Sequence, residues 1–122
     1  MRRFFSLLVA AALLVSCGGG GGSSSGGVGA PSVVAVYTSF GSVQCSGGGT
    51  TLTELQRELL ALGIQVLAAR CGLDGLARPA VCGESDGRIA MFDVDEAQVL
   101  VLLALGFALL STLPNATAAP CS

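Results

Sequence analysis

Two short runs of the chain are apolar at every position. They extend from Val33 to Tyr37 and from Ile89 to Phe92. Runs of this length that are apolar on both faces are typical of strands at the centre of a sheet. The region between them has a different period, because leucines recur there at helical spacing on one stripe: Leu52, Leu55, Leu59 and Leu62. The pattern predicts two central strands with a helix between them.

A five-residue sequence occurs twice. Leu-Leu-Ala-Leu-Gly fills positions 59–63 and 102–106, and an apolar stretch follows each copy, at 64–69 and 107–110. An internal repeat of this kind indicates that both segments form the same structural unit. We expect each unit to be a helix of about three turns with glycine at its C′ position, followed by a strand.

Both copies are preceded by residues that begin helices. Thr51 and Glu54 form a capping box before the first copy, and Asp93 and Glu96 occupy the same two cap positions before the second. The sequence therefore predicts that the second helix is capped at Asp93.

The expected elements follow the order strand, helix, strand, strand, helix, strand. This order resembles the ferredoxin-like βαββαβ arrangement of the α+β class, on pattern alone. The resemblance implies that the first and third strands are central and that the second and fourth are edges. Polar residues in the second and fourth strands agree with edge positions: Gln65, Arg70, Ser111 and Thr112.

The segment from Ala97 to Leu113 also permits a second interpretation. It contains no charged residue, so it could form a transmembrane helix of borderline length. The first copy of the repeat has the same pattern but includes Glu54, Arg57 and Glu58, which shows that the unit is compatible with a water-exposed helix. Both interpretations remain open at this point.

The N-terminus has the features of an exported lipoprotein. Arg2 and Arg3 precede an apolar run from Phe4 to Val15, which is too short to span a bilayer as a helix and fits a signal peptide over residues 1–16. Leu14-Val15-Ser16-Cys17 resembles the lipobox of bacterial lipoproteins. The resemblance implies cleavage before Cys17 and attachment of acyl chains to this cysteine, which together make a stable membrane anchor.

A linker and one domain follow this leader. Residues 17–30 comprise the lipidated cysteine and a segment dominated by glycine and serine, a composition expected to behave as a flexible tether. Residues 31–122 are enough for one small domain. In such lipoproteins Gly18 after the cysteine tends to accompany sorting to the outer membrane. We therefore expect the domain at the periplasmic face of an outer membrane.

Four further cysteines lie in the domain. An even number in an exported chain predicts two disulfides, whereas a zinc site would need close CxxC pairs that are absent. The ferredoxin-like order places Cys45, Cys71 and Cys82 at one end of the sheet. We expect Cys71 to pair with Cys82 across a hairpin turn, and Cys45 to pair with Cys121.

Composition excludes several function classes. The 122 residues include no histidine, lysine or tryptophan, so most catalytic and cofactor templates fail on residue type, and no cofactor is expected. Without Arg2 and Arg3, four arginines remain against eight acids, a net charge of −4 that argues against a nucleic-acid partner. A non-catalytic binding or accessory domain is the first expectation; an integral membrane protein and an enzyme that uses only carboxylates are the alternatives.

Three groups of residues are weak candidates for a site. The glycine-rich segment 45–51 opens a helix and could hold an anion, although a disulfide-bearing loop is the stronger interpretation. Asp93, Asp95 and Glu96 could bind a metal or act as paired carboxylates, but acids are also favoured at a helix N-terminus. Residues 84–87 fit a turn between the second and third strands.

The central strands predict one further surface. Because they are apolar on both faces and the helices cover only one, the open face of the sheet should carry an apolar patch. We expect a homodimer mate, another envelope protein or the C-terminal tail from Pro114 to Ser122 to cover it.

Overall fold

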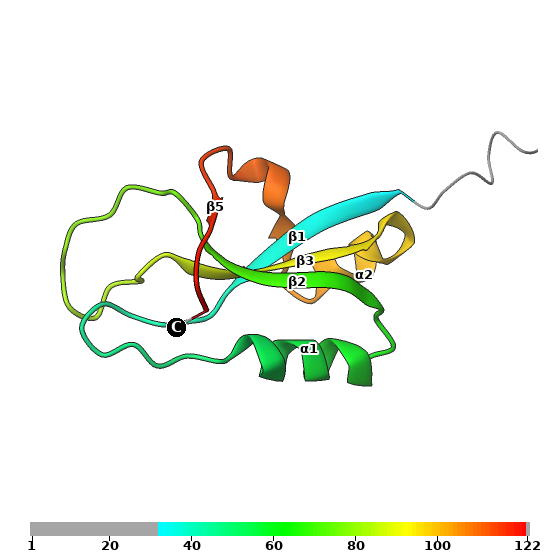
Figure 1. Cartoon of the computed structure of the whole chain (residues 1–122), viewed down its shortest axis with the longest axis horizontal. Coiled ribbons are helices and arrows are strands. Elements are labelled where there is room, and N and C mark those ends of the chain that lie inside the picture. Colours follow the sequence, from blue (N-terminus) through cyan, green and yellow to red (C-terminus); the bar gives the residue numbers. More distant parts are fainter. Residues whose placement is uncertain (1–31, 122) are drawn as a thin grey trace, which may run out of the picture.

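The computed structural model describes residues 32–121, which form an α+β domain (Figure 1). The leader, Cys17 and the linker lie outside the described residues, so the expectations about them remain predictions. The described elements, in chain order, are β1 (Val33–Ser39), α1 (Leu52–Ala61), β2 (Val66–Leu73), β3 (Arg88–Asp95), the 3₁₀ helix η2 (Glu96–Gln98), α2 (Val99–Ala104), β4 (Ala108–Leu109), the 3₁₀ helix η3 (Leu110–Thr112) and β5 (Thr117–Ala118).

One antiparallel sheet contains the five described strands in the order β4-β1-β3-β2-β5. β1 and β3 lie side by side in its centre, which confirms the expectation drawn from their continuous apolar sequence. β5 was not expected. It pairs with Gly72 and Leu73 at the end of β2, so β2 is covered there and the strand order differs from a four-stranded sheet.

Both α-helices pack on one face of the sheet. Phe92 is fully buried in this layer, and its ring centroid lies 6.0 Å from that of Phe107. Leu52, Leu55 and Leu59 of the expected stripe face inward, whereas Leu62, at the C-cap of α1, is exposed. The largest buried residues of the layer come from the two central strands and both helices: Val36, Phe92, Val94, Leu59 and Leu102.

The opposite face of the sheet is covered by the chain itself. Ile89 and Met91 point to this face and are each only 2% exposed, because Leu113 and its neighbours in residues 110–116 pack over them. Of the three coverings expected for the apolar patch, the C-terminal segment is the one observed, although it begins before Pro114. Within residues 32–121, the chain itself thus covers Ile89 and Met91.

The two copies of the repeat have the same structure. In the first, the amide of Ile64 donates to the carbonyl of Leu59 at 2.9 Å; in the second, the amide of Phe107 donates to the carbonyl of Leu102 at 3.0 Å. These are the six-to-one bonds of a Schellman motif, which requires a left-handed residue at C′. The glycines at that position have φ angles of +78° and +99°: Gly63 and Gly106.

The start of the second helix differs from the prediction. Asp93 is not a cap, because β3 continues to Asp95 and Asp93 forms an ion pair with Arg70 across the sheet at 3.1 Å. The side chain of Asp95 caps instead, accepting a bond from the amide of Ala97 at 2.8 Å. The helix begins as η2, and α2 has six residues rather than about three turns. Strand pairing on both sides of β3 thus overrides the local capping signal.

Residues 97–113 do not form the single helix required by the transmembrane interpretation. They are divided among η2, α2, β4 and η3. Within residues 32–121, no helix combines the length and the apolar composition needed to cross a membrane.

The two expected disulfides are present, but the expected pairing is wrong. Cys45 pairs with Cys82, and Cys71 pairs with Cys121. The connection between β2 and β3 is a long loop, residues 74–87, rather than a tight hairpin, so Cys82 lies far along it from Cys71. That loop runs beside the segment after β1, where the amide of Gln44 donates to the carbonyl of Glu84 at 2.8 Å. β5 meanwhile carries Cys121 along the edge of β2 toward Cys71.

Candidate binding cleft at the disulfide-linked end

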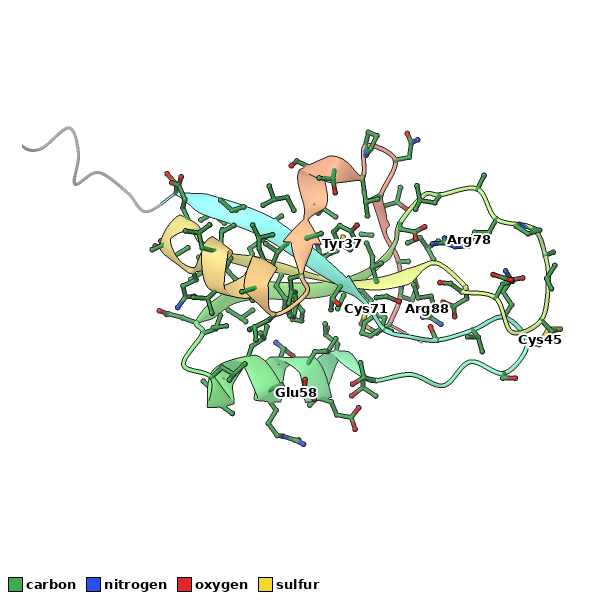
Figure 2. The ribbon with its side chains drawn as sticks, turned by 180° about the vertical axis from the view of Figure 1, so that it is seen from behind. Tyr37, Cys45, Glu58, Cys71, Arg78 and Arg88 are labelled. Carbon is green, nitrogen blue, oxygen red and sulfur yellow. A yellow bond between two sulfur atoms is a disulfide. The ribbon has the colours of Figure 1, made fainter. Side chains whose placement is uncertain are left out.

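A cleft of about 500 Å³ lies where β1 leaves the sheet and α1 begins. This volume is in the range of small-ligand sites. Figure 2 shows this end of the molecule, with Cys45 farthest from the start of β1 and Arg88 nearer the sheet. The lining combines hydroxyl side chains, glycines, one acid, one base and a few apolar groups: Phe40, Ser42, Gly47, Gly48, Thr50, Thr51, Leu52, Thr53, Asp86, Arg88 and Cys121.

The glycine-rich segment forms one wall of the cleft because its backbone passes close to the end of β1. The amide of Thr50 donates to the carbonyl of Phe40 at 2.8 Å. Gly49 has a φ of +78°, and any side chain there would collide with the carbonyl oxygen of Phe40. The interpretation of residues 45–51 as a disulfide-bearing loop is therefore confirmed: Gly49 is required by close approach, and Gly47 and Gly48 by their positive φ angles.

A hydrogen-bonded group forms another part of the lining. The hydroxyl of Ser42 donates to Asp86 Oδ1 at 2.8 Å, and the amide of Arg88 donates to the same oxygen at 3.0 Å. The guanidinium of Arg88 donates to the carbonyl of Pro120 at 2.8 Å, which ties the C-terminal segment to the cleft. These bonds fix the wall, while the hydroxyl of Thr53 is exposed at the rim.

The helix N-terminus beside the cleft already holds a carboxylate of the chain. Glu54 Oε2 accepts a bond from the amide of Thr51 at 2.9 Å and bonds from the hydroxyls of Thr50 and Thr51. The hydrogen bond from the backbone amide of Thr51 is the main cause that lowers the pKa of the Glu54 carboxyl below its ordinary value. The hydrogen bonds from the hydroxyls of Thr50 and Thr51 lower it further. Glu54 beside the cleft and Asp86 in its wall are thus both hydrogen-bonded within the chain.

An ion pair stiffens the loop behind the cleft. The guanidinium of Arg78 binds both carboxylate oxygens of Asp74, at 2.8 and 2.6 Å, and the amide of Leu76 donates to Oδ1 at 3.0 Å. Gly87 lies directly against this pair, where an added Cβ would be 2.9 Å from Arg78 Nη1. Together with the Cys45–Cys82 disulfide, the pair holds residues 74–87 against the cleft. The spacing of Asp74 and Arg78, four residues apart, was the only signal of it in the sequence.

Acid should loosen this loop. The hydrogen bond from Arg78 is the main cause that lowers the pKa of the Asp74 carboxyl. Burial raises this pKa, and the hydrogen bond from the amide of Leu76 lowers it further. A carboxyl whose pKa is lower in the folded state than in the unfolded state stabilises the folded state. This stabilisation is fully present at pH values above the unfolded-state pKa of about 3.9, and it is lost as the pH falls through the folded-state pKa. We expect the melting temperature, followed by far-ultraviolet circular dichroism, to fall below about pH 4. The Asp74→Asn variant should have a lower melting temperature than the wild type at pH 7, and its melting temperature should fall less between pH 7 and acid pH. An equal fall in the wild type and the variant would contradict the assignment to Asp74.

The other candidate residues do not assemble into a site. Asp93 is paired with Arg70, Asp95 caps η2, and Glu96 is exposed. Among the described residues, no three His, Cys, Asp or Glu side chains are grouped as a metal site would require. The interpretation of acids at a helix N-terminus is confirmed for Asp95 and wrong for Asp93. Residues 84–87 lie in the loop between β2 and β3, as expected, and supply Asp86 to the cleft.

The chain was compared with protein-family models, curated proteins and solved structures. None of them matches it. The cleft is therefore assessed by its own geometry.

Sequence reasoning missed most of the cleft. Phe40, Arg88 and Cys121 are far apart in the chain and have no shared motif. They meet because β3 returns beside β1 and because the Cys71–Cys121 disulfide fixes the C-terminus beside α1. Of the lining, the sequence signalled the glycine-rich segment before α1 and Asp86, which lies in the turn 84–87.

Proposed function

We propose that the protein is a lipid-anchored component of the cell envelope, whose domain binds another envelope component without catalysing a reaction. The anchor is Cys17, at the end of the lipobox-like sequence Leu14–Cys17. We place the domain at the periplasmic face of an outer membrane, because Gly18 follows the proposed lipidated cysteine. The observation that carries the proposal is this lipobox together with two disulfides in one small domain, since disulfides persist in oxidising compartments outside the cytoplasm.

The binding surface of this proposal is the cleft. It is concave, it lies at the end of the domain opposite to the start of β1, and its walls are fixed by a disulfide and by the bonds of Asp86. Rigid walls reduce the entropy lost on binding. The exposed hydroxyls and glycine backbone around Thr53 favour an uncharged hydrogen-bonding segment of the partner.

A non-catalytic role is favoured by the side chains available. The sequence has no histidine and no lysine, and the carboxylates beside the cleft are engaged: Glu54 in the capping box and Asp86 with Ser42. A carboxylate whose pKa is lowered, such as that of Glu54, is a weaker general base than one tuned toward neutral pH.

For the fold, we infer a ferredoxin-like sheet extended by β5. In support, β1 and β3 are adjacent and central, β4 and β2 flank them, all pairs are antiparallel, and both helices pack on one face.

The anchor is tested by metabolic labelling of cells with a fatty acid. The wild-type chain should carry label on Cys17, and Cys17→Ser should carry none while accumulating as a precursor. Label that survives the substitution would overturn the lipoprotein assignment.

The cleft is tested in the same cells with a photoreactive amino acid at Thr53. A crosslinked product of one defined mass is expected from this position and not from Ser111, an exposed residue of η3. Arg88→Gln should weaken the crosslink, because Arg88 lines the cleft and binds Pro120. Equal crosslinking from Thr53 and Ser111 would count against the cleft as the binding surface.

A further inference from the structure

Exposed apolar side chains are concentrated at the end of the domain opposite to the cleft. Two lie at the end of α1, two in the first turn of α2, and one each at the starts of β1 and β2. Their exposed fractions range from 48 to 79%. We call this set the apolar end: Val33, Leu60, Leu62, Leu67, Leu100 and Val101.

Direct contacts bring these elements together. The amide after α1, that of Gln65, donates to Gln98 Oε1 just before α2, at 3.1 Å. A shallow pocket there is lined by Gln65, Leu67, Ala97 and Gln98 among others, which joins the start of β2 to η2. Figure 1 shows the start of β1, α2 and the end of α1 at the same end of the molecule.

The chain from Cys17 enters at this end. The carbonyl of Ser32, the first described residue, accepts a bond from the amide of Glu96 at 2.9 Å, and Val33 lies opposite Asp95. Cys17 precedes Ser32 by 15 positions in the sequence, so the chain leads from the proposed anchor to this end. An anchor at Cys17 therefore keeps the apolar end, rather than the cleft, close to the lipid surface.

We propose that the apolar end lies against the bilayer that holds the anchor, so that the cleft faces away from the membrane. This inference rests on the proposed lipid anchor. Grouped exposed apolar side chains can mark a membrane contact, and tethering raises the effective concentration of the bilayer beside them. Leu73, Leu76 and Val81 are exposed at the other end, but they lie at the start of the loop 74–87 or within it, among its charged residues.

Charge determines which lipids should favour this orientation. Asp95 and Glu96 are the acids at the apolar end, and Arg57 and Glu58 lie along α1 beside it. Anionic headgroups would be repelled by Asp95 and Glu96, so burial of leucine drives the contact. Zwitterionic phosphatidylcholine is therefore the lipid for the test.

The test uses single tryptophans, because the sequence contains none. Leu100→Trp places the probe at the apolar end, and Leu76→Trp is the matched control at the cleft end; both side chains are exposed, so neither change removes a core contact. The full acylated protein is reconstituted in phosphatidylcholine vesicles with brominated acyl chains, which quench nearby indoles. Fluorescence of L100W should be blue-shifted and quenched severalfold more than that of L76W.

A second variant tests whether the leucines act together. In this variant, Leu60→Trp carries the probe and Leu100→Glu is added. The second substitution should reduce the quenching of the tryptophan at position 60 to the level seen for L76W. Equal quenching of L100W and L76W, with acyl chains confirmed on Cys17 by mass spectrometry, would overturn the docking and leave the anchor intact. Absence of acyl chains would overturn both. A blue shift of L100W that depends on protein density, without quenching by lipid, would mean that a second copy covers this end and would also overturn the proposal.

Discussion

Replacing Cys71 and Cys121 together with alanine should lower the free energy of unfolding by about 4 kcal/mol. The disulfide joins residues 50 positions apart, and the loss of loop-closure entropy from the unfolded chain gives this size. Cys71 is also 3% exposed and belongs to the helix-side core, so its thiol leaves a small void. The bond further holds β5 against β2 and thereby keeps the segment over Ile89 in place.

Urea unfolding followed by circular dichroism measures this loss, and binding of a hydrophobic dye reports the uncovered sheet face. The matched control is Cys45→Ala with Cys82→Ala, which removes a disulfide of similar separation, 37 residues, between exposed loops. The control should lose similar unfolding free energy but gain little dye binding, because its loops cover no core strand. If both double variants bound dye equally, the C-terminal segment would not be what covers Ile89 and Met91.

Features determined by neighbours in the chain were predicted from the sequence. The capping box of Thr51 and Glu54 and the left-handed glycines after both helices are settled within a few residues, and the structure has them. The central position of β1 and β3 followed from their apolar sequence on both faces. In these cases the local pattern and the tertiary packing agree.

Features determined by distant partners were not predicted. Asp93 has the same cap-like spacing to Glu96 as Thr51 has to Glu54, yet Arg70 binds it and the strand continues. The disulfide pairing depended on the length of the loop 74–87 and on β5, a two-residue strand that no periodicity can reveal. The cleft depends on the same contacts, which is why the sequence indicated its glycine-rich segment and the turn 84–87 but not that they meet.

The second large effect on the free energy of unfolding concerns the first leucine of each copy of the repeat. Leu59→Ala and Leu102→Ala should each lower the free energy of unfolding by about 2–5 kcal/mol, the range for a buried leucine whose site only partly collapses. The two side chains are 2% and 0% exposed and lie in the same core cluster. The carbonyl of each leucine also accepts the six-to-one hydrogen bond, so the two residues occupy the same position of their Schellman motifs.

Leu60→Ala and Leu103→Ala are the matched controls, one position further in each copy, where the side chains are 73% and 39% exposed. Each should cost under about 1 kcal/mol, because little apolar area leaves the core. The comparison separates sequence repetition from structural repetition, since the six-residue α2 has less helix than α1 to support its leucine. If Leu102→Ala cost no more than Leu103→Ala, α2 would be attached loosely to the sheet, and the second copy would repeat the sequence of the first without its role in the core.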